Sequence, residues 1–173
     1  MNRIDGDEDP RDEIITHLAQ LRAFAVSLTR NPVAADDLVQ DTIVKAWKGF
    51  HRYQPGTNLR AWLFTILRNT FYSDLRKAQR EQVSSENEIA ELVTTPDHGD
   101  DRIALIDFER ALGLLPPEQR EALVLVGASG LSYQDAAMTC GVAVGTIKSR
   151  INRGRAKLAE ILEREVASPS QEG

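Results

Sequence analysis

The sequence has 173 residues and a net charge of −5, with 42% hydrophobic and 27% charged residues. These proportions are typical of a soluble globular protein, exclude a wholly disordered chain, and fit either one medium domain or two small ones. The longest uninterrupted apolar run, residues 122–126, falls far short of the roughly 18 residues that a membrane span requires, so membrane insertion is not expected.

The first fifty residues predict two amphipathic helices. Apolar residues recur every three or four positions from 12 to 30, which is the spacing of one helix face. Asn31 and Pro32 follow, and this pair suits the start of a second helix because Asn caps well and Pro fits the first turn. The second helix is expected to run to about Phe50, with Trp47 on its apolar face.

A third helix completes the N-terminal domain. Residues 51–58 contain a Pro-Gly pair and are expected to form a loop. The helix that follows runs to about Arg80, and its spacing turns Phe64 and Leu75 inward. The sequence therefore predicts an all-α domain over residues 10–80.

The rest of the chain predicts a linker and a second helical domain. Residues 81–101 are polar and acidic, which is typical of a flexible linker, with one short helical turn expected near 89–93. About twenty residues can span at most about 70 Å. No period-2 strand pattern appears, so the fold class is all-α, with two small helical domains. The second covers residues 102–165, with helices expected at 102–115, 118–128, 132–139 and 144–164 and a break at Pro116–Pro117.

The net negative charge hides two basic segments. Residues 45–80 hold eight Lys or Arg and one acid, and residues 145–157 hold five basic residues and no acid. The intervening segment 81–109 carries −8. This distribution predicts two surfaces for a polyanion, although either segment alone could simply be the solvated face of a helix.

Residues 130–150 predict a helix-turn-helix. Ser132 can cap a helix with Asp135 three positions on, and Gly141 supplies a turn residue that tolerates positive φ. The second helix of such a motif fits the DNA major groove. Its outward face is Lys148, Ser149, Asn152, Arg153 and Arg155. The alternative is a compact helical hairpin with a solvated basic face.

Cys140 is expected to be a small buried hydrophobe. Because the sequence has one cysteine, an internal disulfide is excluded.

With these motifs, the chain resembles a bacterial sigma factor of the extracytoplasmic-function (ECF) type over residues 14–80 and 105–163. Residues 36–42 resemble the helix that binds the polymerase clamp, 61–69 the segment that melts and reads the −10 element, and 144–155 the helix that reads the −35 element. The resemblance implies core polymerase contacts by Asp37, Leu38, Gln40 and Asp41. It implies −10 binding and melting by Lys48, Arg52, Arg60, Trp62, Asn69, Tyr72 and Arg76. Arg68 and the loop 51–58 are expected to contribute to the same surface. It implies −35 binding by Thr146, Lys148, Ser149, Arg150, Asn152, Arg153 and Arg155.

Within the second domain, residues 121–128 and the pair Cys140 and Gly141 more closely resemble the general-stress-response subgroup of alphaproteobacteria. That subgroup implies core RNA polymerase, promoter DNA and a small helical anti-sigma factor as partners. The chain departs from the family pattern at Ala143, Asn152 and Gly154. Glycine inside a helix costs about 1 kcal/mol relative to alanine, so the recognition helix is expected to bend or fray at Gly154.

Two other functions remain open from the sequence. A sigma-like decoy would bind an anti-sigma factor without touching promoters, and it could dispense with the recognition-helix cations that are present here. An ordinary helix-turn-helix repressor would leave the basic, aromatic N-terminal domain unexplained. Asp36, Asp37 and Asp41 lack a further ligand to complete a metal site, and no phosphate loop or nucleophile motif appears. We therefore expect a cytoplasmic protein without cofactor, metal or enzymatic activity.

Overall fold

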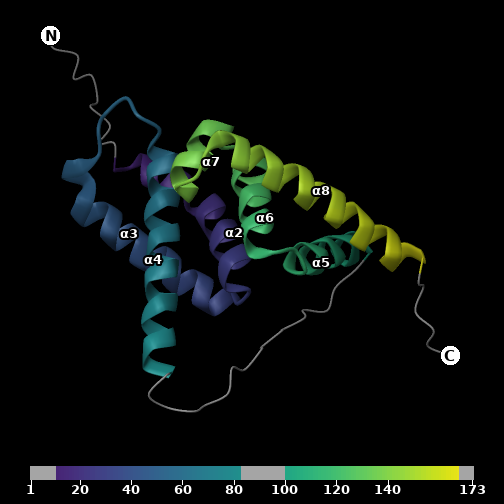
Figure 1. Ribbon diagram of the computed structural model, residues 1–173. Coiled ribbons are helices and arrows are strands. Elements are labelled where there is room, and N and C mark those ends of the chain that lie inside the picture. The colour runs from purple at the N-terminus through teal and green to yellow at the C-terminus, as the bar shows by residue number, and fades with distance from the viewer. Residues whose placement is uncertain (1–10, 83–99, 168–173) are drawn as a thin grey trace, which may run out of the picture.

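The structure is a computed structural model that describes residues 11–82, the N-terminal half, and 100–167, the C-terminal half. All regular elements in these two ranges are helical (Figure 1), which confirms the all-α prediction. The N-terminal half holds α1 (Glu13–Thr16), α2 (Leu18–Thr29), α3 (Pro32–Gly49), the 3-10 turn η1 (Phe50–Arg52) and α4 (Leu59–Gln82). The C-terminal half holds α5 (Asp100–Gly113), α6 (Pro117–Leu123), the π-helical turn η2 (Val124–Ala128), α7 (Tyr133–Cys140) and α8 (Val144–Ala167). Most of the predicted linker, with its helical turn at 89–93, lies outside the described residues.

The start of α3 shows how local chemistry sets a helix boundary. The Asn31 side chain accepts hydrogen bonds from the backbone N–H groups of Val33 and Ala34, at 2.9 and 3.1 Å. Pro32 occupies the first helical position, where its missing N–H costs nothing. The predicted first helix is interrupted at His17, so that α1 is a short separate turn.

Two apolar residues predicted to face inward are exposed instead. Leu75 is 41% exposed because α4 continues past the helices that cover its first half, as Figure 1 shows. Trp47 is 52% exposed, and the guanidinium carbon of Arg11 lies 5.4 Å from its ring centroid. Periodicity placed both side chains on an apolar stripe, but a stripe is buried only where another element lies against it.

The C-terminal half refines one expectation and corrects another. The predicted interruption at Pro116–Pro117 lies between α5 and α6, with Pro117 itself at the first position of α6. α8 is continuous from Val144 to Ala167 and does not fray at Gly154. Gly154 is buried against α6, where an added Cβ would lie 2.9 Å from the Leu123 Cδ1 atom. The glycine therefore allows α8 and α6 to approach closely.

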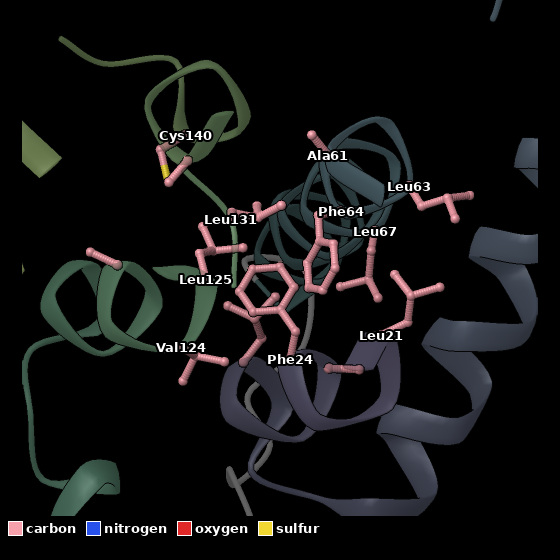
Figure 2. Close-up of a cluster of buried hydrophobic side chains, with 14 of the residues drawn as sticks. Leu21, Phe24, Ala61, Leu63, Phe64, Leu67, Val124, Leu125, Leu131 and Cys140 are labelled. Atoms are coloured by element: carbon pink, nitrogen blue, oxygen red, sulfur yellow. The ribbon is translucent and has the colours of Figure 1, made fainter. Parts of the chain in front are cut away.

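The two halves share one hydrophobic core. Phe24 and Phe64 meet in the N-terminal half with ring centroids 5.2 Å apart. Leu125 and Leu131 of the C-terminal half belong to the same buried cluster, and Figure 2 shows them facing the two rings. Consistently, α4 packs on α7 and α2 packs on α6. The halves thus form a single packed body in this structure.

Candidate nucleic-acid interface

The α7–turn–α8 unit has the predicted helix-turn-helix geometry. Ser132 caps α7, and its hydroxyl oxygen accepts a hydrogen bond from the Asp135 N–H at 3.0 Å. Gly141 ends α7 in the left-handed region at φ 67°, where only glycine is free of a Cβ penalty. Ile147 and Ile151 bury one face of α8 in the core, which fixes the direction of the opposite face.

That opposite face presents the predicted −35 residues to solvent. The exposed members are Lys148, Ser149, Asn152, Arg153 and Arg155, whereas Thr146 and Arg150 are half-buried at its edge. The Arg153 guanidinium lies along the helix, donating from Nε to the Ser149 carbonyl and from Nη2 to the Ser149 hydroxyl, both at 3.3 Å. The Lys148 ammonium lies 6.0 Å from the Tyr133 ring centroid on α7. The face is therefore cationic and carries polar groups able to reach base edges.

The predicted −10 residues divide into two groups. Four of them are exposed on the N-terminal half: Lys48, Arg52, Asn69 and Arg76. Trp62 is half-buried, with its ring centroid 6.0 Å from that of Phe50 and 5.3 Å from that of Tyr53. The indole therefore takes part in packing at the base of the loop 51–58.

The second group contacts the C-terminal half. The Arg60 Nη2 atom donates to the Gly130 carbonyl at 2.8 Å. Arg68 pairs with Glu121, with 2.5 Å between Nε and Oε1, and its guanidinium carbon lies 4.6 Å from the Tyr72 ring centroid. Burial alone would lower the pKa of Arg68, but the hydrogen bond and charge of Glu121 outweigh it and raise that pKa. For Tyr72, burial and the same carboxylate raise the pKa.

The residues predicted to bind the polymerase lie on α3. Asp37, Gln40 and Asp41 are exposed on one face. Leu38 is only 6% exposed, because it lies on the side of α3 that faces the core, so its side chain is not available at this surface. Beside the exposed face, a groove between α2 and α3 is lined by Leu18, Ala19, Arg22, Asp36, Val39 and Gln40.

The sequence did not predict Glu121 as the acidic partner of Arg68. Glu121 is 1% exposed although it is charged, and no local pattern marks it as the partner of Arg68, 53 positions away. Cys140 is buried nearby, as predicted, and burial together with Glu121 raises the pKa of its thiol to about 11. The thiol is thus protonated at neutral pH, which suits a packing role.

Within the two described ranges, no group of His, Cys, Asp and Glu side chains is placed to hold a metal ion. In the same ranges, no helix combines the length and apolar character needed to cross a bilayer.

Comparisons with known proteins agree with the sequence resemblance. Residues 14–81 match the Sigma-70 region 2 family model and residues 105–158 match the Sigma-70, region 4 model. The ECF RNA polymerase sigma factor EcfG of Rhodopseudomonas palustris is 51% identical over 152 residues, covering 88% of this chain and 84% of that protein.

Two solved structures share the fold. The sigma factor RpoE of Bartonella quintana, solved with the anti-sigma factor NepR, matches with a TM-score of 0.79 and 47% identity, covering 90% of this chain and 98% of that one. The structure of CnrH with the cytosolic domain of CnrY matches with a TM-score of 0.65 and 29% identity, covering 92% of each chain. The chain therefore belongs to the ECF sigma factors of bacterial RNA polymerase.

Proposed function

We propose that this chain binds core RNA polymerase and directs it to a set of stress-response promoters. In this proposal, residues 10–80 bind the polymerase and the −10 element, and residues 102–165 bind the −35 element. The observation that carries it is the exposed, acid-free face of the first half of α8, residues 145–157, which follows the capped helix α7 and a left-handed glycine turn. Polymerase carries out the synthesis, so the chain itself acts in the cytoplasm as a specificity factor and not as an enzyme.

Regulation by a small helical anti-sigma factor is part of the same proposal. It is supported by the similarity to RpoE, which was solved with the anti-sigma factor NepR, and to EcfG at 51% identity. The alternative, a decoy that binds such an inhibitor without binding promoters, does not require the cations of α8. Lys148, Arg153 and Arg155 are nevertheless all present and exposed, which favours promoter binding.

Arg153→Ala tests the reading of the −35 element. If the guanidinium reads a base, its loss should weaken promoter binding by about 1–3 kcal/mol, roughly 5- to 150-fold in affinity. Arg164→Ala is the matched control, because it removes the same charge from the same helix, and Arg164 is paired with Glu160 at 2.6 Å far from the turn. The measurement is holoenzyme binding to promoter fragments with an intact or scrambled −35 element. Equal losses for the two variants would contradict the assignment.

A further inference from the structure

One exposed side chain of α8 is suited to recognise a particular base. Ile147, Ile151 and Gly154 are buried on one side of the helix, and Asn152 is exposed on the other. Within the described ranges, the Asn152 amide forms no hydrogen bond with another protein group. Its carbonyl oxygen is therefore free to accept a hydrogen bond from a ligand, and its NH₂ group is free to donate one.

Two cations flank Asn152 on the same surface. Lys148 precedes it by four residues and Arg155 follows it by three, so the three side chains are neighbours along the helix. All three are exposed. Lysine and arginine contacts to phosphates fix the position of a helix on DNA but carry no sequence information. The amide between the two cations is the group that can add this information.

Small residues allow α8 to approach the base edges closely. Four exposed positions, spaced four, three and four residues apart, form one line along the helix opposite its buried side. They are Gly145, Ser149, Asn152 and Ala156. Because an asparagine side chain is short, it reaches a base only where its neighbours do not hold the helix away from the floor of the groove. The major groove, about 12 Å wide, admits a helix of this kind.

We propose that Asn152 reads an adenine of the −35 element through a pair of hydrogen bonds. The Asn152 Oδ1 atom accepts from the adenine N6 amino group, and Nδ2 donates to N7. At the major-groove edge, guanine presents two acceptors, whereas cytosine and thymine each present a single polar group, so none of them satisfies both amide atoms. This inference rests on the proposed function, because it requires α8 to lie in the major groove at the −35 element.

Removal of one DNA atom tests the contact. In 7-deazaadenine, a C–H group replaces N7, so the base pair is kept while one acceptor is lost. Each adenine of the −35 element is replaced in turn, and holoenzyme binding to the promoter fragment is measured for the parent chain and for Asn152→Ala. At one adenine, we expect the replacement to weaken binding of the parent about 3- to 10-fold, the usual value of one hydrogen bond, and binding of Asn152→Ala by less than about twofold.

Base substitution at the same position gives a second readout. The parent should prefer adenine there over any other base by roughly 5- to 150-fold, the usual discrimination of a bidentate pair. Asn152→Ala should lose most of this preference, and it should fold normally because alanine is the better helix former. Arg155→Ala is the matched control from the next turn of the helix. It should weaken binding to all sequences by a similar factor while keeping the adenine preference and the 7-deazaadenine effect.

The outcomes separate this inference from the proposed function. If 7-deazaadenine affects the parent and Asn152→Ala equally at every adenine, or affects neither, Asn152 does not read N7, and the inference is overturned while promoter binding stands. Loss of the adenine preference in Arg155→Ala as well as in Asn152→Ala would also overturn it, because the preference would then belong to the surface as a whole. A parent holoenzyme that does not distinguish an intact from a scrambled −35 element would refute the proposed function, and the adenine assignment with it.

Discussion

Replacing Phe64 with alanine should destabilise the whole chain by about 3–5 kcal/mol, the usual cost of truncating a fully buried phenylalanine. Phe64 is completely buried, packs against Phe24 with the two rings tilted by 47°, and faces Leu125 and Leu131 across the shared core (Figure 2). Its loss removes contacts from both halves at once. Denaturant unfolding followed by circular dichroism measures the change, and hydrogen exchange reports whether protection falls in both halves.

Phe108→Ala is the control for this variant. Phe108 lies on α5 and is 42% exposed, so its truncation should cost far less. If Phe64→Ala lowers the stability of the N-terminal half while exchange in α6 and α7 stays unchanged, the halves do not share a core in solution. Similar losses from both phenylalanine variants would contradict the burial seen here.

The double variant Asp37→Lys, Asp41→Lys should abolish binding to core polymerase while leaving the fold intact. Both carboxylates are exposed on α3, so reversing their charge removes no buried contact. We expect these carboxylates to meet a basic partner surface, where lysines would bring like charges together at a cost of several kcal/mol. That cost is enough to prevent assembly at micromolar concentrations. The measurement is comigration with core polymerase on a sizing column, with circular dichroism as the test of folding.

The matched control reverses two other exposed acids, Glu160 and Glu163, near the end of α8. It changes the net charge by the same amount but lies away from α3. A folded Asp37→Lys, Asp41→Lys variant that still forms holoenzyme would refute the polymerase-binding role of this face. Loss of binding by the control as well would mean that net charge, and not this surface, governs assembly.

Most helices could be predicted because their signals are local. The three- and four-residue spacing of apolar side chains, the Asn31 and Ser132 caps and the Gly141 turn all act within a few positions of the chain. The same local signals misplaced Leu75, since periodicity alone does not reveal where α4 extends beyond its partners. They also gave no sign that Gly154 is needed for close packing against Leu123.

The contacts between the halves could not be predicted from sequence. Arg68 and Glu121 are 53 positions apart, and Asn58 and Asp135 are 77 apart. No spacing rule connects residues on helices whose relative placement depends on the whole fold. The sequence therefore indicated which side chains suit DNA, but not that part of this set is engaged by the chain's own C-terminal half.

Run-off transcription with purified core polymerase, on a stress-type promoter and with or without this chain, tests the central claim most directly. A sigma factor should give transcripts from a defined start site that appear only when the chain is added and that are lost when either promoter element is scrambled. Core polymerase that gives the same products with and without the chain, across promoters of this type, would contradict the claim.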